Sequence, residues 1–68
     1  MDKMTIGAKL RLEREKRKMS MNALAEELYI DPASIGRYER NRNDIPARVF
    51  LKLCAYFDLK FEDFEGMV

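Results

Sequence analysis

The sequence contains no histidine, no tryptophan and a single cysteine, Cys54, among its 68 residues. Histidine and cysteine supply most zinc ligands and many catalytic bases and nucleophiles, so their scarcity argues against a metal site and against most catalytic arrangements. A lone cysteine also excludes an intramolecular disulfide and agrees with a reducing compartment. We therefore expect a protein that is not an enzyme and has no cofactor, and we interpret Cys54 as a buried, space-filling residue.

Long apolar runs and a recognisable signal peptide are missing as well. We accordingly expect a soluble, cytoplasmic protein with no membrane partner and no evident small-molecule ligand. A chain of 68 residues has room for one domain, spanning 1–68, with 1–4 frayed and 65–68 as a tail. Its 47% hydrophobic and 37% charged residues describe a folded helical domain rather than a disordered one.

The formal net charge is only +1, but the charges are unevenly distributed. Basic residues crowd the first twenty positions and the middle of the chain, whereas acidic residues gather near its end. The basic residues are Lys9, Arg11, Arg14, Lys16, Arg17 and Lys18, then Arg37, Arg40, Arg42 and Arg48; the acidic ones are Asp58, Glu62, Asp63 and Glu65. Such a distribution favours an anionic partner for the middle of the chain.

Two short helical patterns lie between Ser20 and Glu39, and each begins with a capping residue. Ser20 opens the first and Asp31 the second, and both side chains can accept hydrogen bonds from free backbone N–H groups. Pro32 follows Asp31 and is well suited to a first helical position. The first helix would bury Met21, Leu24, Ala25 and Leu28; the second would bury Ile35 and Tyr38 and turn Pro32, Ala33, Gly36 and Arg37 to solvent. Two helices arranged in this way can insert the second into a DNA major groove.

The pattern resembles the lambda-repressor/Cro-like, or XRE-type, helix-turn-helix family. The residues that match it in register are Met19, Ser20, Leu24, Ala25, Leu28, Ile30, Asp31, Ile35, Tyr38 and Glu39, and the resemblance extends from about Ile6 to Phe64. It implies an all-α fold, a compact bundle of about five short helices with a central helix-turn-helix, and double-stranded DNA as the partner. It also implies that Arg14 pairs with Glu39, which would tie the first helix to the third and hold the guanidinium near the DNA backbone.

Direct contact with bases is expected from the exposed side of the helix at 32–38. Arg37 can make a two-pronged contact to guanine, and Ser34 can touch either a base or its own helix. Pro32 and Ala33 offer only apolar contact, and Gly36 would let the backbone approach a base or phosphate. Because these side chains are few, DNA shape should carry part of the specificity. The positions expected to contact the DNA backbone are Met21, Asn22, Arg40, Arg42 and Asn43.

The sequence departs from the family pattern at two turns. Tyr29 replaces the usual turn glycine, so either the turn is built differently or packing of the ring offsets a left-handed backbone. Asn41 stands where glycine is common after the second of these helices, a milder change because asparagine tolerates that conformation. Met21 also replaces the glutamine that usually follows the cap, and Asn22 could take over its phosphate contact.

The remaining segments supply the rest of the core. Thr5 is expected to cap a first helix that runs to about Lys18, with Ile6 and Leu10 on its core face and Glu13, Arg14 and Arg17 continuing that stripe. A fourth helix begins at Ile45-Pro46-Ala47 and buries Phe50, Leu53, Cys54 and Phe57. A short fifth helix closes the core with Leu59, Phe61 and Phe64. Tyr56, Phe61, Met67 and Val68 are expected to stay partly exposed and could serve dimerisation.

Together these patterns predict a small transcriptional regulator, a repressor, that binds double-stranded DNA. One such unit reads only a few base pairs, so we expect a homodimer on half-sites about 34 Å apart. The main alternative is the same fold used as a protein-interaction module, such as an anti-repressor or an antitoxin, which the near-neutral charge and the sparse side chains of 32–38 also allow.

Overall fold

The part of the chain that the structure describes forms four short α-helices and one turn of 3-10 helix. The structure is a computed structural model that describes residues 4–67. In chain order the elements are α1 (Ile6–Lys16), α2 (Met21–Leu28), α3 (Pro32–Glu39), α4 (Ala47–Phe57) and the 3-10 helix η1 (Phe61–Phe64). No strand occurs within this described range. The prediction of an all-α bundle is confirmed, and the expected fifth helix is the single turn η1. The predicted fraying of Met1–Lys3 and exposure of Val68 lie outside the described residues.

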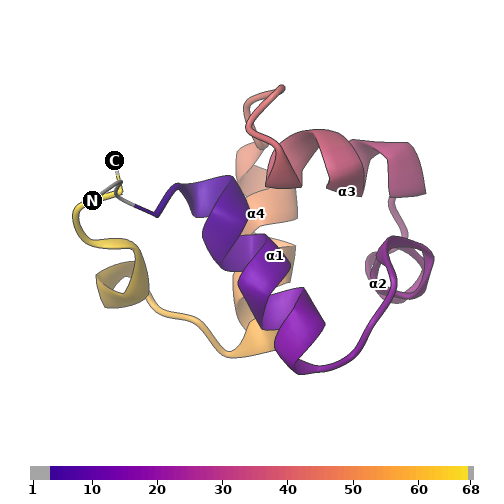
Figure 1. Ribbon diagram of the computed structural model, residues 1–68, viewed down its shortest axis with the longest axis horizontal. Coiled ribbons are helices and arrows are strands. Elements are labelled where there is room, and N and C mark those ends of the chain that lie inside the picture. The colour runs from indigo at the N-terminus through magenta and orange to yellow at the C-terminus, as the bar shows by residue number, and fades with distance from the viewer. Residues whose placement is uncertain (1–3, 68) are drawn as a thin grey trace.

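The helices surround one core, with α2 and α3 on one side of α1 and α4. Figure 1 shows α1 in front of α4 at the centre of the view, α2 and α3 together at the right, and the C-terminal segment at the left. Both α1 and α2 pack against α3. This arrangement supports α3 from two directions and leaves its remaining side uncovered.

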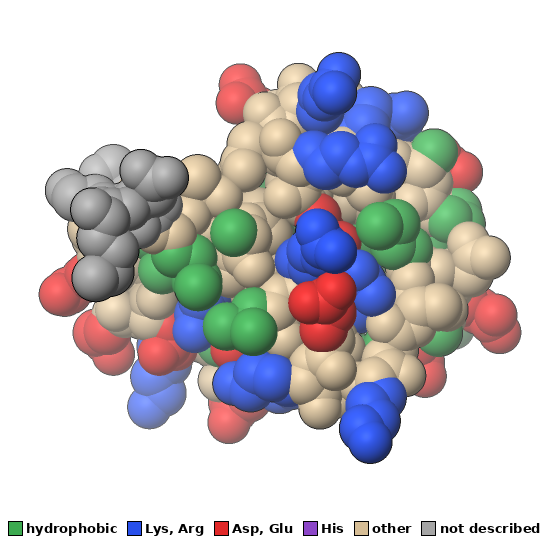
Figure 2. All heavy atoms as spheres, viewed as in Figure 1, with side chains coloured by type: hydrophobic (Ala, Val, Ile, Leu, Met, Phe, Trp, Pro, Cys, Tyr) green, Lys and Arg blue, Asp and Glu red, His purple; other side chains and the backbone are tan. Residues whose placement is uncertain are grey.

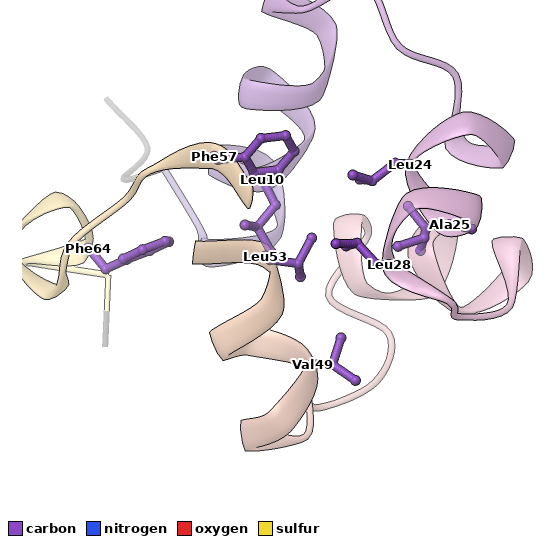
Figure 3. Close-up of a cluster of buried hydrophobic side chains, with 9 residues drawn as sticks. Leu10, Leu24, Ala25, Leu28, Val49, Leu53, Phe57 and Phe64 are labelled. Atoms are coloured by element: carbon purple, nitrogen blue, oxygen red, sulfur yellow. The ribbon is translucent and has the colours of Figure 1, made fainter. Parts of the chain in front are cut away.

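Nine buried apolar side chains make up that core. They are Leu10, Leu24, Ala25, Leu28, Ile35, Val49, Leu53, Phe57 and Phe64. Figure 3 shows the labelled members pointing toward one another from α1, α2, α4 and the C-terminal segment. The burial of Leu24, Ala25, Leu28 and Ile35 was predicted from the two helical patterns, and Met21 and Tyr38 pack against the cluster from half-buried positions.

In α4 the predicted burial of Leu53 and Phe57 is confirmed, and that of Phe50 and Cys54 is corrected. Val49, Leu53 and Phe57 are the buried residues of this helix, whereas Phe50 and Cys54 are half-buried. Val49 was missed because the prediction followed the i, i+3, i+4, i+7 spacing that starts at Phe50. Phe50 instead packs its ring against that of Phe64, with 5.0 Å between the ring centroids. Phe61 does not close the core, since it is 73% exposed.

Each α-helix is followed, one or two residues after its last helical residue, by a residue with a left-handed backbone, and none of these residues is glycine. Lys18, Tyr29, Asn41 and Asp58 have φ between 55° and 59°. After each of them, the next N–H donates to a carbonyl five residues earlier: Met19 to Arg14, Ile30 to Ala25, Arg42 to Arg37 and Leu59 to Cys54, at 2.8 to 3.2 Å. These bonds satisfy carbonyls that the helix ends would leave without partners. They also fix the direction of the segment that follows each helix. Helix α1 ends at Lys16, earlier than the predicted end at about Lys18.

Candidate nucleic-acid interface

Helices α2 and α3 are capped differently at their N-termini. The Oγ atom of Ser20 accepts a hydrogen bond from the backbone N–H of Ala23 at 3.0 Å, as predicted for a cap. Asp31 occupies the corresponding position before α3, but its side chain makes no capping hydrogen bond, which corrects our prediction. Its backbone carbonyl accepts from Ser34 N at 3.0 Å, and Pro32 has no N–H that needs a partner. The proline and this carbonyl therefore define the start of α3 without help from the carboxylate.

The turn between α2 and α3 is the left-handed turn of the family with a tyrosine in it. Tyr29 has φ 57° and ψ 44°, and its side chain is 90% exposed. The turn is therefore not built differently, and packing of the ring does not offset the backbone cost. Neither of the two explanations considered from the sequence holds.

The inner side of α3 is fixed by a buried ion pair with α1. Arg14 donates to both carboxylate oxygens of Glu39, from Nε at 2.7 Å and from Nη2 at 3.0 Å, and its Nη1 donates to the carbonyl of Met19 at 2.7 Å. The hydrogen bonds that Arg14 donates to the Glu39 carboxylate raise the pKa of Arg14, so the guanidinium stays charged. The predicted pair is confirmed. The expected placement of this guanidinium near the DNA backbone stays a prediction; Arg14 is 7% exposed, and three of its N–H groups have acceptors inside the protein.

The outer side of α3 carries the predicted base-contacting residues, with one exception. Pro32, Ala33 and Arg37 are exposed and Ser34 is half-buried. Arg37 donates from Nη2 to Ser34 Oγ at 3.4 Å, so these two side chains lie together on the surface. Gly36 is buried, which corrects the prediction that its backbone is open to a base or phosphate. Since glycine has no side chain, Met21 of α2 and the side chain of Arg40 close over it.

The residues predicted to contact the DNA backbone lie at the two ends of this surface. Asn22 is exposed in the first turn of α2, and Arg40, Arg42 and Asn43 are exposed just after α3. Met21 is half-buried, with its Sδ 3.4 Å from the place where a Cβ of Gly36 would sit. The predicted site residues other than the buried Gly36 thus lie on α2, on α3, which packs against α2, and on the segment that follows α3.

A family model described as helix-turn-helix matches residues 10–64. The match covers most of the chain and includes α2, the turn and α3. The chain belongs to the lambda-repressor-like, XRE-type helix-turn-helix family. Its members are DNA-binding regulators and are typically not enzymes, so membership supports double-stranded DNA as the partner. A search of the curated proteins and a search of the solved structures each returned no match.

Asn41 is a structural residue of this helix-turn-helix domain that sequence reasoning missed. Its Oδ1 accepts from the N–H of Gly7 at 3.2 Å, and its Nδ2 donates to Thr5 Oγ1 at 2.8 Å. The start of α1 is thereby bound to the end of α3. Gly7 permits the approach, because a Cβ there would lie 2.7 Å from the carbonyl oxygen of Glu39. A glycine two positions after the Thr5 cap was the available signal for close packing.

The basic residues of the helix-turn-helix domain differ in their partners. Ion pairs join Lys9, Lys16 and Arg17 to Glu13, Arg11 to Glu15, and Arg14 to Glu39. By contrast, Arg37, Arg40, Arg42 and Arg48 form no ion pair within residues 4–67. Figure 2 shows Lys and Arg side chains gathered over α3 at the top of the view, with acidic side chains around the C-terminal segment at the left. Positive charge around α3 is therefore not neutralised by ion pairs within the described residues, a property that Lys18, Lys52 and Lys60 share.

Other kinds of site were sought in the same part of the chain. Between residues 4 and 67 there is no group of three or more potential metal ligands, and no helix is long and apolar enough to cross a membrane. An apolar groove of about 440 Å³ lies where α1, α4 and η1 meet the loop after α3. Its walls include Ile6, Ile45, Phe50, Phe61 and Phe64, with Asn43 and Asp44 among its polar lining residues.

Proposed function

We propose that this protein is a transcriptional repressor that binds double-stranded DNA as a homodimer, with α3 in the major groove. The observation that carries the proposal is the division of α3 into two sides. Ile35 and Glu39 are buried on one side, and Glu39 is held there by Arg14. Ala33 and Arg37 are exposed on the other, and Arg37 has no carboxylate partner within residues 4–67. A helix held so firmly on one side can present the other to base edges at little entropic cost.

In the proposed complex, base contacts come from the exposed side chains of α3. Arg37 donates to guanine O6 and N7, and Ser34 exchanges its bond to Arg37 for one to a base or phosphate. Pro32 and Ala33 contact thymine methyl groups. Gly36 is not among these residues because it is covered.

Backbone contacts come from both ends of the same face. The first turn of α2 leaves the N–H groups of Met21 and Asn22 without helical partners, and such groups bind a phosphate well. Arg42 and Asn43 extend from the segment after α3 toward the phosphates on the other side of the groove. Repression is the simplest regulatory outcome, since occupancy of a promoter suffices and no contact to another protein is needed.

A homodimer is supported by size and by exposed apolar surface. The molecule measures 32 Å along its longest axis, close to the ~34 Å between half-sites one helical turn apart, so two copies fit side by side. Leu51 of α4 is 67% exposed, and Phe61 of η1 is 73% exposed. We expect Phe61→Ser to weaken dimerisation in sedimentation equilibrium, and an unchanged association constant would contradict this surface.

The test of DNA binding is a titration of labelled duplex at several salt concentrations. We expect the logarithm of the binding constant to fall steeply with the logarithm of salt concentration, because each neutralised phosphate contributes about 0.9 to the slope. Arg37→Ala should weaken binding by about 1–3 kcal/mol on the preferred duplex. Arg11→Ala is the matched control, since it removes the same charge from α1, where Arg11 pairs with Glu15.

The opposite result has a definite meaning. Weak binding that is insensitive to salt and equal in wild type, Arg37→Ala and Arg11→Ala would exclude a DNA-binding role for α3. It would favour the protein-interaction module, for which the apolar groove beside α4 and η1 offers a surface.

A further inference from the structure

Arg40 lies on the same side of α3 as the exposed base-contacting residues. In an α-helix, positions separated by four and by seven residues share a face, and this spacing relates Ala33, Arg37 and Arg40. Arg40 is the residue that ends α3, and its N–H still donates to the carbonyl of Gly36 at 3.1 Å. Its side chain therefore starts from the helix and not from the loop beyond it.

The guanidinium of Arg40 is folded back along α3 over Gly36. Its Nη2 and Cζ atoms lie 3.6 Å and 3.9 Å from the place where a Cβ of Gly36 would sit. The Sδ of Met21 lies 3.4 Å from the same point, so α2 also borders this place. Helical side chains lean toward the N-terminus of their helix, and Gly36 provides the room for a long side chain to do so. The charged group is consequently located over Gly36, one turn back from the end of α3.

Nothing in the described part of the chain occupies the donors of this guanidinium. The side chain of Arg40 makes no hydrogen bond or ion pair with residues 4–67, and it is exposed. The neighbouring carboxylate of Glu39 accepts from Arg14 with both oxygens. Met21 offers a thioether, which is a poor acceptor. The guanidinium of Arg40 thus lies over Gly36. Arg40 is exposed, and no residue between 4 and 67 accepts a hydrogen bond from its side chain.

We propose that Arg40 reads a guanine in the major groove, and that Gly36 and Met21 form the seat that positions its guanidinium. This inference rests on the proposed function, since it assigns a further specificity residue to the same DNA-binding surface. Two parallel N–H groups of arginine match O6 and N7 of guanine, whereas a phosphate contact would need only the charge. The placement over Gly36, and not out along the loop, favours the base.

The test is a selection from a library of random duplexes, carried out with the wild type and with Arg40→Lys. Lysine keeps the charge and loses the rigid fork. We expect one guanine preference in the wild-type consensus to disappear in Arg40→Lys, while the preference assigned to Arg37 remains. On the wild-type consensus duplex the variant should bind roughly 5- to 150-fold more weakly, with an unchanged dependence on salt.

Two substitutions of Gly36 test whether the seat formed by Gly36 and Met21 positions the guanidinium of Arg40. A Cβ at this position would meet Met21 and Arg40 at ordinary contact distances, so Gly36→Ala should keep the guanine preference. Gly36→Leu would fill the place of the guanidinium and should remove the same preference as Arg40→Lys. Circular dichroism and urea unfolding of both variants establish that they are folded before their DNA preferences are compared.

The possible outcomes separate this inference from the proposed function. If the wild type selects no duplex sequence and binds none tightly, the proposed function fails. If the wild type selects a sequence and Arg40→Lys retains every base preference, Arg40 is a phosphate contact and the inference is overturned while the function stands. If Gly36→Leu is folded and retains the guanine preference, the seat is overturned.

Discussion

Two groups of basic side chains, one on α1 and one around α3, face different partners. The α1 group consists of Lys9, Arg11, Arg14, Lys16 and Arg17, and each of its members pairs with a carboxylate of the protein. The α3 group consists of Arg37, Arg40 and Arg42, and none of its members forms an ion pair within residues 4–67. The number of basic residues along the chain therefore does not locate a binding surface. The two groups differ in whether a carboxylate of the folded protein pairs with their side chains.

The comparison predicts that the α1 group acts on stability and the α3 group on binding. Glu13 is 4% exposed and is surrounded by Lys9, Lys16 and Arg17, and Arg17 also donates to the carbonyl of Phe57 at 3.1 Å and stacks on its ring. These contacts join α1 to the end of α4. A mutation that breaks a pair of the α1 group with a buried carboxylate, Glu13 or Glu39, should consequently be felt in unfolding experiments, and a mutation in the α3 group in DNA titrations.

The largest expected effect is that of breaking the buried pair of Arg14 and Glu39. Arg14→Met leaves the carboxylate of Glu39 buried without its partner, and we expect the free energy of unfolding to fall by about 3–5 kcal/mol. For a domain of this size that is a large share of the total stability. Urea unfolding followed by circular dichroism measures the change.

The double substitution Arg14→Met and Glu39→Met is the control for this prediction, since it removes both charges and keeps the volume. It should recover much of the loss, because no unpaired charge remains buried. A single variant that loses less than about 1 kcal/mol, or a double variant as unstable as the single one, would show that the pair does not hold α3.

The next effect concerns Glu13, the shared acid of the α1 group. The hydrogen bond from Arg17, assisted by Lys16 and Lys9, lowers the pKa of Glu13 from 4.5 to about 2. Because the folded-state pKa is the lower one, its contribution to stability is fully present above pH 4.5 and is lost as the pH falls toward 2. Glu13→Gln should lower the free energy of unfolding at pH 7 by about 1.5–3 kcal/mol, and this difference should shrink below pH 4.5.

Glu15 provides the matched control for Glu13. Its carboxylate pairs with Arg11 on the surface, where both side chains are at least half exposed, so Glu15→Gln should change stability by less than about 1 kcal/mol. Equal effects of the two substitutions, at pH 7 and at pH 3, would mean that burial does not set the strength of these ion pairs.

The third prediction moves to the α3 group. Arg42→Ala should leave the free energy of unfolding within about 0.5 kcal/mol of wild type, since its side chain is exposed and has no ion-pair partner within residues 4–67. In the proposed complex it should reduce the slope of log binding constant against log salt by about 0.9. Arg11→Ala should leave that slope unchanged, and a reduction of equal size would remove the distinction between the two groups.

The sequence predicted those features that depend on spacing within one helix. The Ser20 and Thr5 caps, the buried residues of α2 and the start of α3 at Pro32 all follow from local pattern. The pairing of Arg14 with Glu39 followed from family resemblance, because a separation of 25 residues carries no local signal.

The predictions that failed depend on which neighbouring residue packs over or bonds to a given position. Gly36 has the helical phase of an exposed residue, but Met21 and Arg40 come from outside its own turn to cover it. The side chain of Asp31 could have capped α3, yet the carbonyl of the same residue already supplies the acceptor. Val49 was missed because the i, i+3, i+4, i+7 spacing suggested Phe50, whereas the packing of α4 favours the position one residue earlier. The side-chain direction of Arg40 is likewise a property of the assembled surface.

The smallest expected effect is a gain in stability that touches neither basic group. Tyr29 has a left-handed backbone and a ring that is 90% exposed, so Tyr29→Gly removes strain and loses almost no packing. We expect stability to rise by up to about 1 kcal/mol, or a few degrees in the melting temperature, with no change in DNA affinity.

Asn41→Gly is the informative contrast, because Asn41 shares this backbone conformation but also bonds Gly7 N and Thr5 Oγ1. Removal of those bonds should cancel the gain, and a melting temperature that rises equally in both variants would show that Asn41 does not bind the start of α1 to the end of α3.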